Sequence, residues 1–165
     1  MNALRIRSHL PIRASGIARP VVLFFTSLLI LLFFFQLGSR DLVSSHEARA
    51  AQNAQRMLDT GEWGLPTLFD GQADLQKPPL FYWLVAAAGE LNGGRVSAWA
   101  ARLPAALSAV LCVLLVYAFL RREGCTTGAV VGAASVATAN HFVAIGRTAR
   151  IDVPLTLAVA VSLLA

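Results

Sequence analysis

Hydrophobic residues in this sequence occur in long runs that are separated by short charged segments. The first run, residues 20–39, contains no charge and would reach about 30 Å as an α-helix, the thickness of the hydrocarbon core of a bilayer. Two later runs, 103–120 and 126–146, are also long enough to span a membrane, and a fourth occupies 153–165. The pattern predicts an all-α, polytopic membrane protein with three complete transmembrane helices and the start of a fourth. Since a polar flank normally follows such a helix, we expect the N-terminal portion of a longer protein.

One apolar segment, Pro78 to Gly89, is too short to cross a bilayer. As a helix it would extend about 18 Å, and its first turns carry Phe81, Tyr82 and Trp83. Aromatic rings with a polar edge are typical of the headgroup level of a membrane. We therefore expect an interfacial helix here rather than a span.

The positive charges predict the orientation of these helices. Residues 1–19 contain four arginines and no acidic residue, and loops rich in Lys and Arg stay in the cytoplasm. The N-terminus is then cytoplasmic, 40–102 is a large extracytoplasmic loop, 121–125 is a cytoplasmic hairpin and 147–152 is a second outer loop. The two arginines of that second outer loop run against the rule, and an anionic ligand would explain them. A cleaved signal peptide is the alternative for the first run, but its apolar region would be shorter, about 7 to 15 residues.

The composition agrees with a membrane protein. Hydrophobic residues make up 56% of the 165 residues and charged residues 14%, and the mean hydropathy is +0.63. The charges behind the formal net charge of +5 are confined to the gaps between apolar runs, a distribution that excludes a nucleic-acid-binding protein. Cys112 and Cys125 have neither disulfide nor zinc-ligand spacing. Because no charge falls inside the three complete spans, chemistry is expected at the outer interface.

The outer loop is predicted to begin with a short amphipathic helix. Ser44 and Glu47 have the spacing of a capping box, and Gly61 provides a helical stop. Between them a helical period is formed by Ala48, Ala51, Ala54, Met57 and Leu58. We expect this stripe to face lipid or other helices.

Two further local signals follow in the outer loop. Asp70-Gly71 has the chemistry of a tight two-residue turn. In Lys77-Pro78-Pro79, Pro78 favours an extended backbone at Lys77, and the prolines start the interfacial helix stiffly.

The predicted topology gathers charged side chains at the outer face of the membrane. They are Glu47, Lys77, Arg147, Arg150 and Asp152. Each alone has a structural interpretation: a capping-box partner, a snorkelling lysine, two headgroup anchors and the N-cap of the fourth span. Together they offer a carboxylate as general base towards a hydroxyl and cations that neutralise a departing phosphate. The set suits group transfer from a lipid phosphate to an acceptor at the outer leaflet.

Several motifs in a fixed order resemble a known family. They are LGSRDL, HEAR, RMLDTGEW, GQADLQKPPLFYWL, WAARLPAAL and GRTARIDVPLTL, and they cover about residues 37 to 160. This order is similar to the N-terminal part of bacterial integral-membrane glycosyltransferases (GT-C type) related to the aminoarabinose transferase of lipid A and to protein O-mannosyltransferases. The resemblance implies a fold of many transmembrane helices with surface-lying helices in the first outer loop. It also implies transfer of a sugar, with inversion, from a polyprenyl-phosphate carrier to an extracytoplasmic lipid, glycan or protein.

The resemblance assigns roles to individual positions. Glu47 matches the second acid of the family's acidic pair, Arg49 the arginine two positions on, Lys77 the phosphate-binding lysine and Asp152 the aspartate after the third span. The donor-phosphate set expected here is completed by Arg147 and Arg150.

Three positions depart from the family's pattern. His46 replaces the first acid of the pair, Ala50 replaces a frequent tyrosine, and Gln76 replaces a frequent acid that is a metal ligand in some relatives. Since a neutral His46 can act as a base or a metal ligand, the catalytic base stays open between Glu47, Asp152 and His46. The cofactor is unknown, and a divalent metal stays open because three ligands are not identifiable.

The expectation is therefore the N-terminal portion of an inner-membrane glycosyltransferase of bacteria, with its active site outside the cytoplasm. Its expected partners are a polyprenyl-phosphate sugar donor, a lipid or protein acceptor and the bilayer, with no nucleic acid. The alternatives are an inactive relative, a non-catalytic lipid-binding or assembly component, or a transporter fragment. Transporters carry ionisable groups at mid-membrane depth, which this sequence lacks.

Overall fold

The computed structural model describes residues 18–68 and 70–164, and it describes the side chains of the first helix from Leu23 onward. Most of the predicted cytoplasmic segment 1–19 lies outside the described residues. In the described part, regular structure is helical except for one isolated antiparallel bridge between Thr67 and Ala73. The helices are α1 Ala18–Phe34, α2 Ser45–Thr60, α3 Leu80–Leu91, α4 Ala98–Arg122, α5 Thr126–Thr138, α6 Asn140–Gly146 and α7 Asp152–Leu164.

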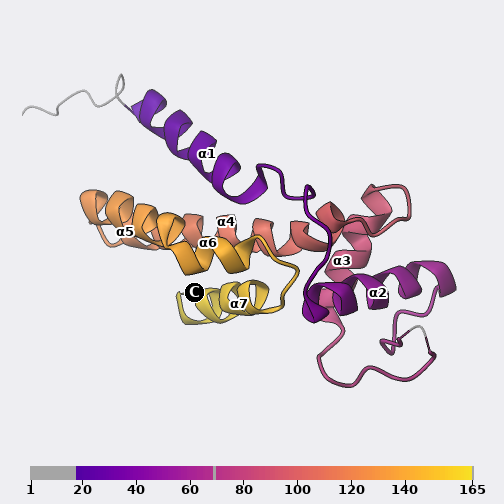
Figure 1. The fold of residues 1–165 in the computed structure, drawn as a ribbon. Coiled ribbons are helices and arrows are strands. Elements are labelled where there is room, and N and C mark those ends of the chain that lie inside the picture. Colours follow the sequence, from indigo (N-terminus) through magenta and orange to yellow (C-terminus); the bar gives the residue numbers. More distant parts are fainter. Residues whose placement is uncertain (1–17, 69, 165) are drawn as a thin grey trace, which may run out of the picture.

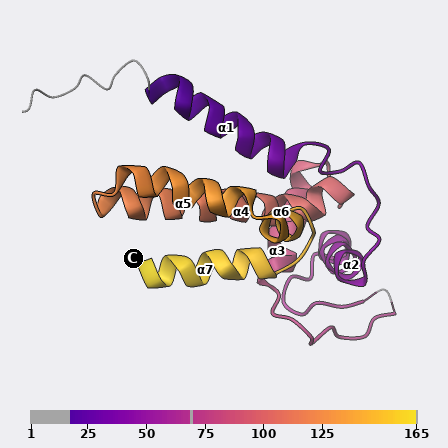
Figure 2. The same cartoon turned by 60° about the vertical axis from the view of Figure 1, so that its left-hand side comes forward.

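The helices form an elongated bundle with a cap at one end. Helices α4, α5 and α7 run side by side along the molecule, and α1 lies beyond them at an angle (Figures 1 and 2). The cap consists of α2, α3 and the loop between them. Helix α2 is seen from the side in Figure 1 and almost end-on in Figure 2, whereas the bundle stays lengthwise in both. Helix α2 therefore crosses the bundle axis steeply.

One helix of the described residues, α4, is both long and apolar enough to cross a membrane on its own. Helices α5 and α6 meet the same criteria together, although they are bent by 63° at their junction. The described apolar part of α1, Leu23–Phe34, is shorter, as are α3 and α7. The bundle is thus built from apolar helices of unequal length.

The helix boundaries differ from the predicted runs for local reasons. Helix α4 starts at Ala98 because the Ser97 hydroxyl caps it, accepting the Ala100 N–H at 3.3 Å. The predicted run 126–146 is two helices because Ala139, with φ −62° and ψ 113°, has an extended backbone. Helix α1 ends at Phe34, before the predicted end of the run 20–39, where turns follow.

Two hydrophobic cores correspond to the bundle and the cap. In the bundle core, Phe33 of α1 is fully buried beside alanines of α4 and α5 and Val153 of α7. In the cap core, Met57 of α2 packs with Phe81 and Tyr82 of α3. The small residues let the helix backbones approach closely, which is how helices associate in lipid.

Helix α2 has the predicted caps and a slightly shifted buried face. The Ser44 hydroxyl accepts the Glu47 N–H at 3.2 Å, and Gly61 ends the helix in the left-handed region at φ 72°. The buried face consists of Glu47, Ala50, Asn53, Ala54 and Met57. This face packs against α3. The sequence left open whether it would face lipid or another helix, and in the structure it faces a helix.

The predicted interfacial helix is α3, at twelve residues. One face is buried in the cap core, while Leu80, Trp83 and Leu84 are exposed. The Trp83 indole N–H donates to the Trp63 carbonyl oxygen at 2.7 Å. Helix α3 thus has an apolar exposed face with the Trp83 N–H satisfied inside the protein, and its position at the headgroup level of a bilayer stays a prediction.

The predicted two-residue turn at Asp70-Gly71 is longer in the structure. The Leu68 N–H donates to the Gln72 carbonyl oxygen at 2.9 Å, and the Gly71 N–H donates to the Leu68 carbonyl oxygen at 2.9 Å. Gly71 adopts φ 80°, in the left-handed region that favours glycine. The loop between α2 and α3 is thereby folded back on itself.

Candidate functional site

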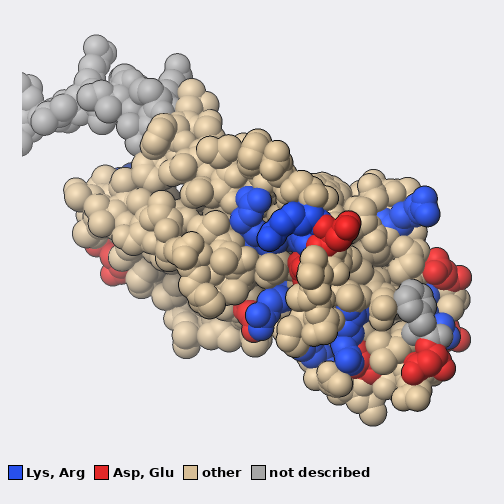
Figure 3. Space-filling view, in the orientation of Figure 1, with Lys and Arg blue, Asp and Glu red and all other residues tan. Residues whose placement is uncertain are grey.

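Most of the charged residues that the structure describes gather at the capped end of the bundle, while Arg121, Arg122 and Glu123 lie at the hairpin between α4 and α5. Figure 3 shows blue and red side chains over the cap and the adjoining loops, whereas the face over the bundle is almost entirely uncharged. The loop 147–151 and the segment 36–44 lie at this end as well (Figures 1 and 2). The site is therefore built where α2, α3 and the outer ends of α1, α4 and α6 meet.

The centre of this end is a buried ion pair between Glu47 and Arg102. The Arg102 Nε donates to Glu47 Oε1 at 2.8 Å and its Nη2 to Oε2 at 3.2 Å, with both side chains almost fully buried. Arg102 also donates to the carbonyl oxygens of Leu37, Arg40 and Asp41 at 2.8 to 3.0 Å. One arginine thus fixes the start of α4 to α2 and to the segment after α1.

Glu47 accepts a third hydrogen bond, from the loop between α6 and α7. Its Oε1 accepts the Ala149 N–H at 3.0 Å. Burial alone would raise the pKa of Glu47, but hydrogen bonds from Arg102 and Ala149 and the charges of Arg102 and Arg40 outweigh it, so the pKa is lowered. The carboxylate stays ionised and holds the loop, instead of completing the capping box with the Ser44 N–H.

A small pocket of about 20 Å³ lies beside this ion pair. It is lined by His46, Arg49, Ala50, Gln76, Lys77, Phe81, Tyr82, Ala149 and Ile151. Three predicted site residues, His46, Arg49 and Lys77, therefore meet in one place, although they come from α2 and from the segment before α3. The pocket combines two permanent cations with a histidine, a combination that favours an anionic group.

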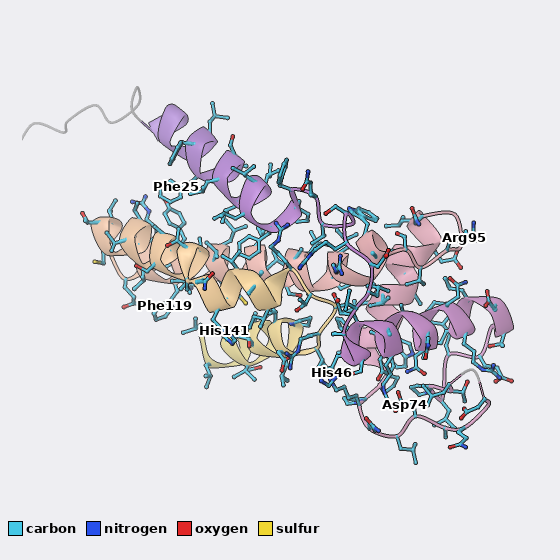
Figure 4. The ribbon with its side chains drawn as sticks, in the orientation of Figure 1. Phe25, His46, Asp74, Arg95, Phe119 and His141 are labelled. Carbon is cyan, nitrogen blue, oxygen red and sulfur yellow. The ribbon has the colours of Figure 1, made fainter. Side chains whose placement is uncertain are left out.

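A second buried carboxylate, Asp74, supports this pocket. Its Oδ1 accepts Arg49 Nη1 at 3.1 Å, and its Oδ2 accepts Asn53 Nδ2 at 2.8 Å and the Tyr82 hydroxyl at 3.3 Å. Burial alone would raise the pKa of Asp74, but the hydrogen bonds from Asn53, the Gln76 N–H and Arg49 lower it. Burial and the Asp74 charge raise the pKa of Tyr82 to about 12. Figure 4 shows Asp74 and His46 at the same end of the molecule.

Arg147 lies outside the pocket lining and caps a helix. Its Nη1 donates to the Leu32 carbonyl oxygen at 2.7 Å and its Nη2 to the Phe35 carbonyl oxygen at 2.6 Å. These contacts satisfy carbonyl groups at the C-terminal end of α1, where a cation also complements the helix dipole. Two of the five N–H donors of Arg147 are thus used by backbone carbonyl groups, and its predicted role as a phosphate ligand stays a prediction.

Arg150 and Asp152 form an exposed ion pair, with Arg150 Nε 2.8 Å from Asp152 Oδ2. Neither lines the pocket, but the residues on either side of Arg150, Ala149 and Ile151, do. Asp152 is the first residue of α7. The pair therefore sits next to the pocket, on the loop that Glu47 holds.

The donor set of the pocket does not fit a divalent metal ion. His46 is the one usual metal ligand in the lining, and Arg49 and Lys77 would repel a cation there. Within residues 18–68 and 70–164, no group of three or more His, Cys, Asp or Glu side chains could hold a metal.

Three residues of this site were not singled out from the sequence. For Arg102 the sequence does contain a signal. It directly precedes an apolar run, and an arginine that is buried at the start of such a helix needs an acidic or carbonyl partner. Asp74 and Tyr82 had none, because their partners are set by how the loop before α3 folds. The sequence motifs around all three are part of the resemblance, but the motifs do not state which side chains meet.

Comparison with known proteins places the chain among membrane transferases. The family model of the dolichyl-phosphate-mannose-protein mannosyltransferases matches residues 76–165. An uncharacterised protein of Aquifex aeolicus is 30% identical over 135 residues, which are 81% of this chain and 26% of that protein. The undecaprenyl phosphate-alpha-4-amino-4-deoxy-L-arabinose arabinosyl transferase of Shewanella sediminis is 38% identical over 96 residues, which are 57% of this chain and 17% of that enzyme.

The fold matches a solved membrane enzyme. The crystal structure of ArnT from Cupriavidus metallidurans in the apo state matches with a TM-score of 0.80 at 24% identity, over 88% of this chain and 26% of that one. The structure of the same protein bound to undecaprenyl phosphate matches with a TM-score of 0.79 at 24% identity, over 87% of this chain and 26% of that one. The chain thus spans about a quarter or less of the length of the relatives that it matches.

Proposed function

Because the chain belongs to the dolichyl-phosphate-mannose-protein mannosyltransferase family, we propose that it is the N-terminal portion of a membrane glycosyltransferase. The enzyme takes a sugar from a polyprenyl-phosphate carrier in the bacterial inner membrane and passes it to a lipid, glycan or protein acceptor outside the cytoplasm. Support for the donor comes from the structural match to ArnT, which was crystallised with undecaprenyl phosphate. The observation that carries the proposal is the pocket that joins His46, Arg49 and Lys77.

In this proposal the two cations of the pocket hold the donor phosphate. Lys77 acts as a point charge and Arg49 as a planar donor, and both stabilise the negative charge that grows as the phosphate leaves. The acceptor oxygen attacks the anomeric carbon as the bond between that carbon and the phosphate oxygen breaks. The phosphate keeps the electron pair of that bond, and attack from the opposite side inverts the sugar.

Of the three predicted bases, His46 is the one whose side chain lines the pocket. We assign it the acceptor proton, because an imidazole nitrogen can act as a general base. Glu47 is engaged with Arg102 and Ala149, so its role is to position the loop. Asp152 with Arg150 forms the adjoining wall, where it can orient the acceptor.

A second function, lipid-phosphate binding without transfer, is favoured by one observation. Among the described residues, no Asp or Glu lines the pocket, and the two buried acids nearby are held in ion pairs, Glu47 with Arg102 and Asp74 with Arg49. A protein of this kind would bind polyprenyl phosphate and leave the sugar in place.

The test is sugar transfer from a polyprenyl-phosphate sugar by the complete natural protein in lipid vesicles. Lys77→Met is expected to lower kcat/KM by about 100-fold or more, because it removes a cation from the leaving phosphate. Arg95→Met is the matched control, since Arg95 is exposed and its loss removes the same charge away from the pocket (Figure 4). Transfer that is insensitive to Lys77→Met would contradict the assignment, and binding of the donor without any transfer would favour the second function.

A further inference from the structure

We propose that Asp74 is a positioning residue that aims Arg49 and Tyr82 into the pocket and so sets its affinity for a phosphate monoester. The inference rests on the proposed function, because it takes the pocket to bind a polyprenyl phosphate. Nothing in the motif resemblance assigns a role to Asp74. The inference follows from which side chains share this one carboxylate.

Asp74 lies in the loop between α2 and α3, and its side chain is completely buried. A buried carboxylate is costly unless every oxygen accepts hydrogen bonds. Here Oδ1 accepts Arg49 Nη1 at 3.1 Å and the Gln76 N–H at 3.4 Å, and Oδ2 accepts Asn53 Nδ2 at 2.8 Å and the Tyr82 hydroxyl at 3.3 Å. Four donors from three segments of the chain converge on one group.

Three of these four donors belong to residues that line the pocket. Arg49 comes from α2, Tyr82 from α3 and Gln76 from the segment between them. Lys77 follows Gln76 directly in the sequence. The hydrogen bond from the Gln76 N–H to Asp74 therefore also restricts the position of the Lys77 backbone. Asp74 therefore connects the two segments that carry the basic side chains of the pocket, α2 with Arg49 and the loop before α3 with Lys77.

Arg49 keeps donors available for a ligand. A guanidinium has five N–H donors, and within the described residues one hydrogen bond, from Nη1 to Asp74, is made by this side chain. Its side chain is 31% exposed, in contrast to the buried Arg102. An arginine that is held on one edge by a buried acid loses less freedom when its other edge binds phosphate.

The test is the affinity of the complete protein for undecaprenyl phosphate in nanodiscs, measured for four proteins. These are the wild type, Asp74→Asn, Arg49→Met and the double variant. Asp74→Asn is expected to weaken binding about tenfold, the loss of one charge-assisted contact. The double variant is expected to lose less affinity than the two single losses combined, because Asp74 acts in part through Arg49.

Electrostatics alone predicts the opposite result for Asp74→Asn. Removing a negative charge beside an anion site should tighten binding, so the direction of the change separates positioning from a simple field effect. Asp70→Asn is the matched control, since Asp70 is an exposed acid in the same loop and its affinity should stay within about twofold. Tyr82→Phe removes one hydroxyl while keeping the buried ring, and it is expected to weaken binding about threefold without unfolding the protein.

Each outcome has a distinct meaning. Binding that Asp74→Asn leaves unchanged or tightens, or losses that add fully in the double variant, would overturn the inference and leave the proposed function standing. A wild-type protein that does not bind undecaprenyl phosphate would overturn both. A weakened and non-additive Asp74→Asn, with Asp70→Asn unaffected, would establish the positioning role.

Discussion

At the scale of single residues, Arg102 organises the outer end of the molecule. Its guanidinium donates to both oxygens of Glu47 and to three backbone carbonyl groups between Leu37 and Asp41. A buried pair of this kind contributes little compared with apolar residues of the same shape, but removing one partner leaves an uncompensated charge. The contacts of Arg102 therefore fix an arrangement of segments more than they add net stability.

Arg102→Met is expected to lower the free energy of unfolding by about 3 to 5 kcal/mol, because Glu47 would remain buried without its partner. The measurement is unfolding in mixed micelles of mild detergent and dodecyl sulfate, followed by circular dichroism. Arg122→Met, at the exposed C-terminal end of the same helix, is the control and should change stability by less than about 0.5 kcal/mol. A similar small change for both variants would contradict the account of the pair.

At the scale of elements, the apolar runs predict where helices lie but not where they break. The run 126–146 contains neither proline nor glycine near Ala139, so hydropathy alone gives one straight helix. The buried face of α2 likewise differs in part from the predicted stripe, since Ala50 is buried in the cap core while Ala51 is only partly buried at its edge. In both cases packing against other helices decides between backbone geometries that the local sequence allows almost equally.

The stop of α2 at Gly61, in contrast, is encoded locally and can be tested. Gly61→Ala is expected to cost about 1 kcal/mol of stability, because Gly61 has φ 72° and an alanine there is strained. Gly64→Ala is the matched control: an added Cβ meets no atom within 4 Å at either position, but Gly64 lacks the left-handed backbone. Detergent unfolding of the two variants should separate them, and equal losses would show that backbone strain is not the cause.

At the scale of the whole molecule, the charge pattern predicted one charged end, but not the partners within it. Asp74 is 25 residues from Arg49, and Glu47 is 55 residues from Arg102. Residues so far apart in the sequence show no periodic pattern that would link them. Which acidic side chain is paired with which arginine is therefore seen only in the folded structure. Charge and topology put Lys77 with Arg147, and the resemblance added Arg49, as a hypothesis about the donor phosphate that stays a prediction. In the structure Lys77 and Arg49 line one pocket, while Arg147 and Glu47 hold backbone groups of other segments.

The predicted orientation in the membrane can be tested with a native cysteine. Cys125 is exposed at the hairpin between α4 and α5, at the opposite end of the bundle from the cap (Figure 1). A membrane-impermeant maleimide added to intact spheroplasts should label Glu62→Cys but not Cys125, and both should react after lysis. A Cys125→Ser background identifies the signal from position 62. Labelling of Cys125 in intact cells would reverse the predicted orientation of the hairpin.

The contacts of Glu47 also imply an order of events while the chain is being made. Its partners Arg102 and Ala149 follow it by 55 and 102 residues. On the predicted topology, Glu47 emerges early on the outer side of the membrane and must stay hydrated until the later segments that carry Arg102 and Ala149 are in place. The segment around Glu47 therefore reaches its final shape only after α4, α5 and α6 have been made, so a ribosome stalled before residue 149 would leave the pocket unfinished.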